Sequence, residues 1–411
     1  MNELILHMAE QAETRCADRF RAIDKISEKN TERLLDAFRN ARVSEACFAG
    51  TTGYGYDDLG RETLDRIYAE LMGTESAIVR IGFVNGTHAL TAALFALALP
   101  GQHLLSATGL PYDTLQEAIG IRGNAFGSLS SYGIGYDQID LLPDGRINIS
   151  ALKTAAAKSG TAAVILQRSR GYTERKALSV DEIAEITETV KAINPDIAVM
   201  VDNCYGEFTD IREPGHVGVD LLAGSLIKNP GGGLAPAGGY IAGRSELVER
   251  AAMRLTTPGI GGECGASLGC NRLLFQGLFL APHTTAQALK TAVFCAAMME
   301  QLGIRSFPGV NDNRSDIIQT VCLGSEERMR RFCRGIQKGA PVDAFVTPEP
   351  WAMPGYDDPV IMAAGSFIQG SSIELSADGP IRPPYAVYMQ GGLTYESGKL
   401  GILMAVEELL L

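Results

Sequence analysis

The chain has 411 residues, of which 46% are hydrophobic and 20% charged, and it carries a formal net charge of −12. This length is sufficient for about two or three folded domains, and the composition is that of a globular protein rather than a disordered one. The acidic charge balance, without a basic run, argues against nucleic acid as a partner.

The sequence indicates neither a secreted nor a membrane protein. The first residues, Met1 to Leu4, include an acidic side chain and lack the basic, apolar and small-residue order of a signal peptide. An uncharged stretch at 81–112 is broken by the polar segment 85–88 and by Pro100–Gly101, so its apolar part is shorter than the roughly 18 residues of a membrane span. The eight cysteines form no Cys-x-x-Cys pair, which favours free thiols over a metal site. We expect a cytoplasmic protein.

The N-terminal part of the chain is predicted to be helical. Residues 2 to about 40 place apolar side chains on one face of an amphipathic helix. A loop rich in glycine and tyrosine follows at 50–60, and a second helix is predicted at 62–72. We assign residues 1–60 to an N-terminal helical arm with an interface loop.

Strands and helices then alternate along the chain. Strands are predicted at 77–79, 103–106, 162–166, 197–201, 221–223 and 240–242, and helices at 89–99 and 180–193. Strands that alternate with helices over about 180 residues predict an α/β domain with a mainly parallel sheet whose two faces are covered. We assign residues 61–295 to this large domain.

A smaller domain is predicted at 296–411. A long helical pattern at 282–302 would connect it to the large domain. Within the small domain the patterns predict helices at 314–338 and 396–411 and strands at 361–368 and 372–375.

Lys228 is the most informative residue of the sequence. It follows a predicted strand and is flanked by small residues in the segment 225–233, and Asp202 ends the neighbouring predicted strand 197–201. A lysine in such a position can bind an aldehyde cofactor, and an acid at a neighbouring strand end can keep a ring nitrogen protonated. The pair predicts pyridoxal 5′-phosphate as the cofactor.

Two further segments are candidates for the cofactor phosphate. The segment 85–88 follows a strand and opens a helix, so its N–H groups and the Thr87 hydroxyl form an anion site. An ordinary turn with Thr87 as a helix cap is the alternative. Ser225 lies three residues before Lys228 and could reach the same phosphate, unless it is only a serine at a strand end.

Three side chains are candidates for contact with the cofactor ring and the substrate. Tyr112 begins a helix and could stack on the ring and move a proton to a leaving group, or it is a surface tyrosine. Tyr205, three residues after Asp202, could donate to the ring oxygen, or it is a core tyrosine. Arg382 has the planar fork that suits a substrate carboxylate, or it is an exposed loop arginine.

A Gly-x-Ser-x-Gly motif at 265–269 competes with this hypothesis. In α/β hydrolases an acid and then a histidine follow the serine. Only His283 follows Ser267, and no acidic residue lies between them, so we interpret the motif as a chance match. A dinucleotide fingerprint at a strand-to-helix turn and a phosphate-binding P-loop sequence are both absent from the sequence.

Several segments resemble the fold-type-I pyridoxal-phosphate enzymes, and more narrowly the methionine gamma-lyase and cystathionine beta-lyase relatives known as aluminium-resistance proteins. The matching segments are 53–61, 85–90, 201–208, 225–233, 376–382 and 390–395. The resemblance implies the aspartate aminotransferase-like fold, with a mainly parallel seven-stranded sheet in the large domain and a small α+β C-terminal domain. It also implies a homodimer or homotetramer with the active site at a subunit interface.

The resemblance assigns roles to the candidate residues. Lys228 would be the Schiff-base lysine and Asp202 the partner of the pyridine nitrogen. Gly86, Thr87 and Ser225 would surround the phosphate, and Tyr112 would stack on the ring. Arg382 would bind the substrate carboxylate, and Tyr56 would reach the phosphate of the neighbouring subunit. The sequence departs from the typical lyases at Asp58, where they have an arginine two positions after that tyrosine, and Arg61 is the alternative candidate for its contact.

The resemblance implies a carbon–sulfur lyase that acts on a methionine-, cystathionine- or cysteine-type amino acid by β- or γ-elimination, giving a 2-oxo acid, ammonia and a thiol. The spacing from Asp202 to Tyr205 is instead like that of aspartate-type aminotransferases, which keeps amino-group transfer as an alternative. A non-catalytic relative is a third hypothesis, but it gives no physical reason for Lys228, Asp202 and Arg382 to be present together.

Overall fold

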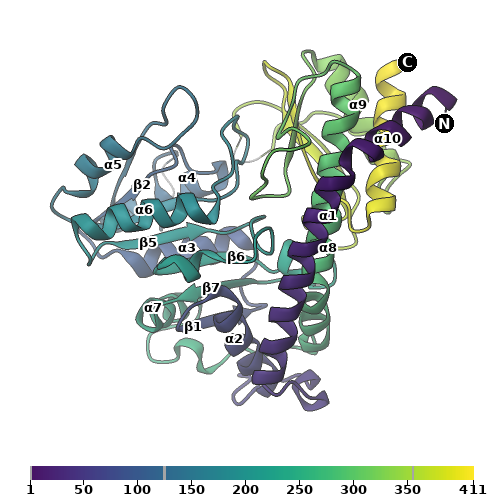
Figure 1. Ribbon diagram of the computed structural model, residues 1–411. Helices are drawn as coiled ribbons and strands as arrows, with labels where there is room; N and C mark the ends of the chain where they lie inside the picture. The colour runs from purple at the N-terminus through teal and green to yellow at the C-terminus, as the bar shows by residue number, and fades with distance from the viewer. Residues whose placement is uncertain (1, 124–125, 354–355) are drawn as a thin grey trace.

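The computed structural model describes residues 2–123, 126–353 and 356–411. A large α/β domain and a smaller domain with its own sheet lie beside a pair of long helices (Figure 1). Among the residues described, no helix combines the length and the apolar character that a bilayer crossing requires. All eight cysteines are free thiols.

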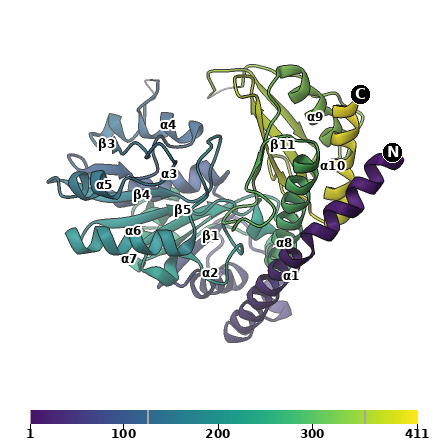
Figure 2. The ribbon, with the colours of Figure 1, turned by 45° about the horizontal axis from the view of Figure 1, so that its top comes forward.

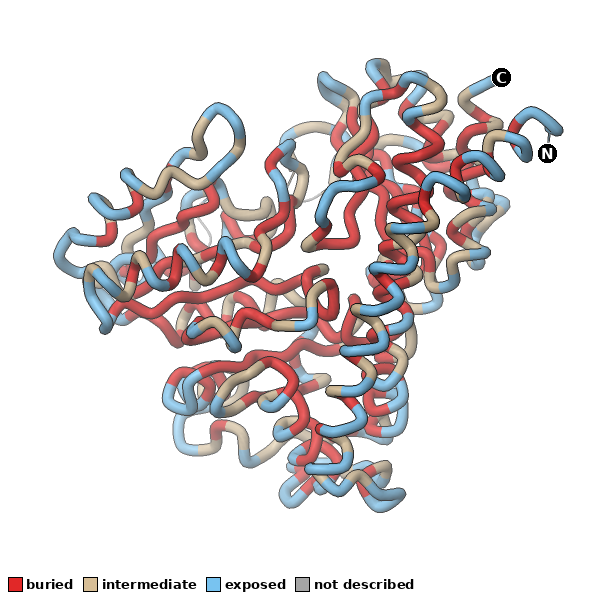
Figure 3. The backbone as a smooth tube through the Cα atoms, in the orientation of Figure 1, coloured by how far each residue is buried: buried red, intermediate tan, exposed pale blue. Residues whose placement is uncertain are grey.

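Helix α1 (Glu3–Asn40) runs alongside α8 (Asn271–Gln301) in both ribbon views (Figures 1 and 2). Its start is capped by the Asn2 side chain, which accepts a hydrogen bond from the Leu4 N–H at 3.0 Å. Its buried residues recur about once per turn and therefore share one face. Figure 3 shows buried and exposed residues alternating along this helix. The predicted helix at 2–40 is therefore confirmed.

The large domain contains a seven-stranded sheet. Its strands in spatial order are β1 (Ser76–Arg80), β7 (Gly239–Gly243), β6 (Leu221–Ser225), β5 (Ala198–Asp202), β4 (Thr161–Gln167), β2 (His103–Ser106) and β3 (Gly135–Gln138). Strand β7 is antiparallel to both β1 and β6, and the other neighbours are parallel. The predicted mainly parallel seven-stranded sheet is confirmed.

Helices cover both faces of this sheet. One face packs against α2 (Leu59–Met72), α5 (Ile149–Ala156), α6 (Val180–Ile193) and the first half of α8, and the other against α3 (Gly86–Leu97), α4 (Asp113–Ile119) and α7 (Ser245–Leu255). Val199 and Met200 of β5 belong to opposite clusters, because successive strand residues point to opposite faces. The central strands are buried along their length (Figure 3), as a doubly covered sheet requires.

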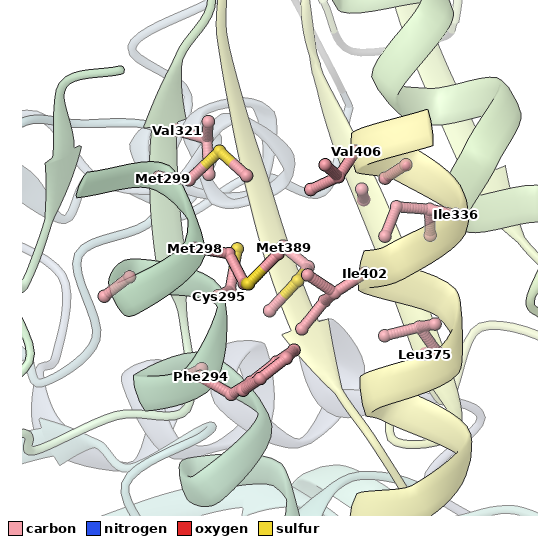
Figure 4. Packing of buried hydrophobic residues seen from close by; sticks show 14 of the residues in the cluster. Phe294, Cys295, Met298, Met299, Val321, Ile336, Leu375, Met389, Ile402 and Val406 are labelled. Atoms are coloured by element: carbon pink, nitrogen blue, oxygen red, sulfur yellow. The ribbon is translucent and has the colours of Figure 1, made fainter. Parts of the chain in front are cut away.

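The small domain contains a five-stranded antiparallel sheet. Its order is β10 (Val360–Ala364), β11 (Leu375–Pro380), β12 (Ala386–Gly391), β9 (Gln319–Cys322) and β8 (Ser306–Phe307). One face packs against α9 (Glu326–Lys338), α10 (Tyr395–Leu410) and the second half of α8. Figure 4 shows Phe294 and Met298 of α8 meeting Met389 of β12 and Ile402 of α10 in this core. The boundary that we placed at residue 295 falls inside α8, which contributes to both cores.

Three predictions in the C-terminal part need correction. The predicted helix at 314–338 is wrong in its first part, where β9 pairs with β12 and β8, and only α9 is helical. The apolar β-branched run at 317–323 suits a buried strand, and Ser325 caps α9 with a hydrogen bond from the Arg328 N–H. The strand predicted at 372–375 lies further along, as β11, and β12 was not predicted. Helix α8 begins eleven residues before the predicted start at Pro282, which lies inside it.

Candidate active site

Three neighbouring parallel strands end at one edge of the large sheet and bring the first site residues together. β4 ends at Gln167, β5 at Asp202 and β6 at Ser225. The register pairs Gln167 with Asp202, and Lys228 follows β6 after a short turn. Because open parallel sheets bind ligands outside the carboxyl ends of their strands, this edge is the expected ligand site.

Asp202 is buried at the end of β5, with 7% of its surface exposed. One carboxylate oxygen accepts a hydrogen bond from the Cys204 N–H at 3.1 Å. Burial raises the pKa of the carboxyl, while the charge of Lys228 lowers it in part. A carboxylate in this position is stabilised by a cationic partner, which is what a protonated ring nitrogen would supply.

Lys228 lies above the ring of Tyr205, with its Nζ 4.0 Å from the ring centroid. Burial alone would lower the pKa of this amine. The acidic groups of Cys204, Tyr205 and Asp202 outweigh burial, so the pKa is raised overall. The structure therefore brings the lysine, the tyrosine and the aspartate of the sequence hypothesis within electrostatic reach of one another.

The start of α3 lies against the end of β6. The Asn85 side chain caps the helix by accepting from the His88 N–H at 2.9 Å. A Cβ added at Gly86 would lie 3.0 Å from the Cβ of Ser225 and 3.7 Å from the Sγ of Cys204. A Cβ at this position would be in a tighter contact than side chains ordinarily make, so glycine suits the close approach of the helix start and the serine. The first helical N–H groups have no partner within the helix.

Hydroxyl groups surround the same helix start. The Thr87 hydroxyl lies 3.0 Å from that of Thr114, near the beginning of α4. With Ser225 these hydroxyls and the helical N–H groups form a donor set that suits a phosphate. The sequence hypothesis included Thr87 and Ser225 but missed Thr114, although its place two residues after Tyr112 at a predicted helix start was an available signal.

Tyr112 is the residue that precedes α4, at the predicted helix start. Its N–H donates to the Gln167 side chain at 3.1 Å, and its hydroxyl lies 2.7 Å from that of Tyr356. Burial raises its pKa well above the ordinary value, so the hydroxyl keeps its proton at neutral pH. Tyr112 thus spans from the large sheet to the small domain.

Tyr205 occupies a left-handed backbone conformation, with φ of 68°, just after β5. Its hydroxyl lies 3.4 Å from that of Ser372 in the small domain. The sequence hypothesis placed this hydroxyl on a cofactor oxygen. In the structure the ring faces Lys228, and the hydroxyl bonds across to the other domain.

Arg382 lies in the turn between β11 and β12, with its side chain 53% exposed. Its guanidinium donates to the Asp358 carboxylate at 2.9 Å. Its charge also lowers the pKa of Asp113, at the start of α4, although burial raises that pKa overall. The arginine is therefore close to the site but already paired, and a substrate carboxylate would compete with Asp358.

Tyr56 lies on the exposed loop before α2. Its ring stacks on Tyr54 with centroids 5.6 Å apart, and 52% of its surface is exposed. Within one chain it faces solvent rather than the cluster around Lys228.

Asp58, the position that departs from the typical lyases, is buried within its own chain. Its carboxylate accepts hydrogen bonds from the hydroxyls of Thr51 and Ser267, from the Asn271 amide at 3.0 Å and from the Arg61 N–H at 3.0 Å. Burial alone would raise its pKa, but these bonds lower it to about 2. Ser267, the serine of the hydrolase-like motif, thus serves this hydrogen-bond cluster.

Arg61 is also committed within the chain. It is 4% exposed, and its guanidinium donates to the backbone oxygens of Gly55, Gly265 at 3.0 Å and Glu263 at 3.2 Å. These bonds join the loop before α2 to the loop before α8. The side chain that we considered for a phosphate contact therefore holds two loops of its own subunit together.

Sequence reasoning missed a cluster of aromatic and acidic side chains to which both domains contribute, Tyr172 from the large domain and Tyr388 and Asp378 from the small one. Tyr172 lies between Tyr112 and Tyr388, with ring centroids at 5.9 and 5.0 Å. Its hydroxyl donates to Asp378 of β11. Asp378 lies in the matched segment 376–382, but nothing in that segment alone indicated that its carboxylate faces the site.

A second missed cluster lies behind Asp202. The buried Arg168 donates to Asn203 at 2.7 Å and to Glu213 at 3.2 Å, and its N–H donates to the backbone oxygen of Asp202 at 3.0 Å. Glu207 accepts from the Tyr240 hydroxyl at 2.8 Å, and burial raises its pKa to about 8. These fully buried groups fix the strand ends that carry the site.

The fold is that of the fold-type-I pyridoxal-phosphate-dependent enzymes. The pyridoxal-5′-phosphate-dependent protein YhfS from Escherichia coli shares it, with a TM-score of 0.63 at 18% identity over 94% of this chain and 97% of that one.

The chain belongs to the methionine gamma-lyase family, whose model matches residues 5–410. An uncharacterized protein of Bacillus subtilis (strain 168), YnbB, is 51% identical to it over 99% of this chain and 97% of that protein. A carbon–sulfur lyase involved in aluminium resistance from Clostridium novyi NT has a similar structure, with a TM-score of 0.96 at 50% identity, over 100% of this chain and 97% of that one.

Proposed function

We propose that this protein is a pyridoxal-phosphate-dependent carbon–sulfur lyase that acts on a sulfur-containing amino acid by β- or γ-elimination. The products would be a 2-oxo acid, ammonia and a thiol. The observation that carries the proposal is the meeting of Lys228 and Asp202 at adjacent strand ends beside the start of α3. The family match and the description of the Clostridium novyi protein support the lyase reaction over other reactions of this fold.

The residues present fit the cofactor. Lys228 would bind its aldehyde covalently, and Asp202 would hold its ring nitrogen protonated. Gly86 leaves open the space beside Ser225 that a Cβ would fill, and the helix N–H groups with the hydroxyls there would hold the phosphate. When bound, pyridoxal phosphate supplies an electron sink for the charge that develops at the substrate α-carbon.

The protein side chains would then move protons and orient the substrate. The Lys228 amine would take the α-proton. The Tyr112 hydroxyl, held at the border of the two domains, would protonate the leaving thiolate. Arg382 would bind the substrate carboxylate, in competition with Asp358.

We propose a homodimer or homotetramer in the cytoplasm as the working form. Tyr54 and Tyr56 form an exposed aromatic pair beside loops that Arg61 and Asp58 hold rigid. Such an ordered apolar surface suits burial against a second copy. Tyr56 would then reach the phosphate of the neighbouring subunit's cofactor.

Amino-group transfer is the second candidate function. It is favoured by Tyr205, which follows Asp202 at aminotransferase spacing and lies directly under the Lys228 amine. The two reactions differ in their products, since transamination requires a keto-acid acceptor and releases neither thiol nor ammonia.

A substrate panel of methionine, cystathionine and cysteine tests the proposal. We expect thiol, ammonia and 2-oxo acid to appear together without any keto acid. Lys228→Ala is expected to abolish the reaction, and the exposed Lys153→Ala serves as the matched control. Amino transfer that depends on added keto acid, with no thiol, would replace the lyase with the second candidate.

A further inference from the structure

A cavity of about 400 Å³ lies at the β1 edge of the large sheet. It is bounded by the end of β1, by α2, by the end of α7 and by the loop that leads into α8. Figure 1 shows α2, β1 and α7 at this end of the large domain. Gly53 and Leu268 on its wall are exposed, so the cavity opens to solvent. Its lining residues are different from those that we assign to the cofactor and the substrate.

Two buried arginines line this cavity, Arg61 of α2 and Arg80 at the end of β1, with 4% and 6% of their surface exposed. The Nε–H group of each is buried and has no hydrogen-bond partner in the described part of the chain. Such groups are rare in proteins, because a buried N–H without an acceptor loses the free energy of its hydration. Two of them at one cavity indicate an acceptor that enters from outside the chain.

Gly265, in the loop before α8, lies beside both guanidinium groups. Its backbone oxygen accepts a hydrogen bond from Arg61 at 3.0 Å, and a Cβ added to it would lie 3.7 Å from the Nε of Arg80. Its φ of 128° is a conformation that side chains rarely allow. The glycine therefore leaves the approach to the Arg80 Nε–H open.

The wall of the cavity carries positive charge. Among the residues that the structure describes, no acidic side chain lines it. Arg80 is neutralised by Asp65, whose two oxygens accept from its Nη1 at 2.7 and 2.8 Å. Arg61 donates to backbone oxygens, and the half-exposed carboxylate of Glu62 lies 3.5 Å from it. The Asp58 carboxylate is enclosed by its own donors. A buried cation without a closely bound carboxylate favours an anionic ligand.

Most of the remaining wall is apolar. Leu64 of α2, Val79 of β1, Leu255 of α7 and Leu274 of α8 line it. An inorganic anion would leave these side chains uncovered, whereas an aliphatic chain would bury them. The volume also falls within the roughly 300–1,000 Å³ of small-molecule sites.

We propose that this cavity binds a small carboxylate with a short aliphatic chain. The Nε–H groups of Arg61 and Arg80 would donate to the carboxylate, and the chain would contact the apolar wall. The side-chain oxygen of Asn271 also lines the cavity, is buried and has no partner among the described residues. It would accept from an amino or hydroxyl group where the ligand carries one. The site is separate from the cluster around Lys228, and the inference does not rest on the proposed lyase reaction.

Cys264 reports on the cavity, because its partly exposed thiol is part of the wall. The full-length protein loaded with pyridoxal phosphate is treated with iodoacetamide, and mass spectrometry measures the rate of alkylation at each cysteine. Butyrate is the first ligand, since it has no amino group that could react with pyridoxal phosphate. At about ten times its dissociation constant we expect it to slow the alkylation of Cys264 about tenfold. Cys322, a partly exposed thiol of β9 in the small domain, should react at an unchanged rate.

Further ligands define the chemistry. 1-Butanol has the chain without the charge, and inorganic phosphate has the charge without the chain, so neither should protect Cys264 at the same concentration. Equal protection by either of them overturns the proposal. Tighter binding of 2-aminobutyrate than of 2-oxobutyrate would identify an amino acid as the ligand, and the reverse order a 2-oxo acid.

Two variants test the position of the ligand. Gly82 lines the cavity, and the nearest atom to an added Cβ there is a Leu255 methyl 4.0 Å away, so Gly82→Leu should fill the cavity without disturbing either arginine. We expect it to lose the protection by butyrate. Arg80→Lys keeps a charge beside Asp65 but removes one Nε–H, and it should bind butyrate about tenfold more weakly. The half-exposed Arg250→Lys is the matched control. Undiminished protection in Gly82→Leu, or a Cys264 that is unreactive without butyrate, overturns the proposal.

Discussion

Asp58 and Asp378 are both almost fully buried, yet their carboxyls behave in opposite ways. Asp58 receives four hydrogen bonds, and its pKa falls to about 2. Asp378 receives two, and its pKa rises to about 6. Burial raises both pKa values; the bonds from four donors outweigh it at Asp58, whereas the bonds from two donors and the charge of Lys228 do not outweigh it at Asp378. The Asp58 carboxylate holds two loops together, whereas the Asp378 carboxyl has a pKa of about 6 because it is buried with fewer donors.

The largest expected effect is the loss of stability in Asp58→Asn. Its pKa lies below the ordinary 3.8, so the ionised carboxylate stabilises the fold above about pH 4, and this contribution is lost as the pH falls towards 2. We expect the variant to unfold about 3 kcal/mol more easily at pH 7, because charged hydrogen bonds are lost and their donors stay buried. Urea unfolding measures this. Asp57→Asn, at the exposed neighbouring position, is the control, and equal destabilisation of both would contradict the role of the four bonds.

Asp378→Asn should change stability with the opposite sign. A carboxyl whose pKa is raised from 3.8 to about 6 favours the folded state at low pH, and this advantage is lost as the pH rises from about 4 through 6. The variant should therefore be more stable than the natural protein at pH 8, by up to about 2 kcal/mol, and show no such gain at pH 4. Melting temperatures across this range test it. A loss of stability at pH 8 would show that the comparison with Asp58 is wrong.

Gly86→Ala tests whether the proposed phosphate site requires the close approach of Gly86 to Ser225. The added Cβ would lie 3.0 Å from the Cβ of Ser225, so the helix start or the serine must shift by a few tenths of an ångström. We expect about tenfold weaker binding of pyridoxal phosphate, or about 1.4 kcal/mol, measured by fluorescence titration. At Gly82 the nearest atom to an added Cβ is 4.0 Å away, so Gly82→Ala is the control. If the two variants bind pyridoxal phosphate with equal affinity, the start of α3 does not form part of the phosphate site.

The smallest effect concerns a carboxylate that is only partly buried. Asp358→Asn removes the ion-pair partner of the half-exposed Arg382. If Arg382 binds the substrate carboxylate, the freed guanidinium should lower KM a few-fold without changing kcat, because solvent-exposed ion pairs are weak. Steady-state kinetics on the preferred substrate measure this. An unchanged or raised KM would show that a group other than Arg382 binds the substrate carboxylate.

The sequence predicted those parts of the site that depend on local pattern. Lys228, Asp202 and Ser225 follow or end strands, and parallel strands bring their carboxyl ends to one edge wherever the rest of the chain goes. Gly86 and Thr87 open a helix for the same local reason. The helix prediction over β9 was wrong because a strand is stabilised mainly by the strands that pair with it. Of the two partners of β9, β12 is distant in the sequence and β8 is short.

By itself the sequence determined the fold class, the alternation that builds the parallel sheet, and the lysine and aspartate at neighbouring strand ends. Hydrophobic periodicity and strand ends depend on a few consecutive residues, so they can be predicted without knowing the fold. Only the tertiary structure decided that four donors surround Asp58 and that the Arg61 guanidinium donates to backbone oxygens. It also decided that Asp378 accepts a hydrogen bond from Tyr172, although 206 positions separate the two residues in the sequence. Side chains from distant parts of the sequence form the environment of a buried charge, and no local sequence pattern predicts which of them will contact it.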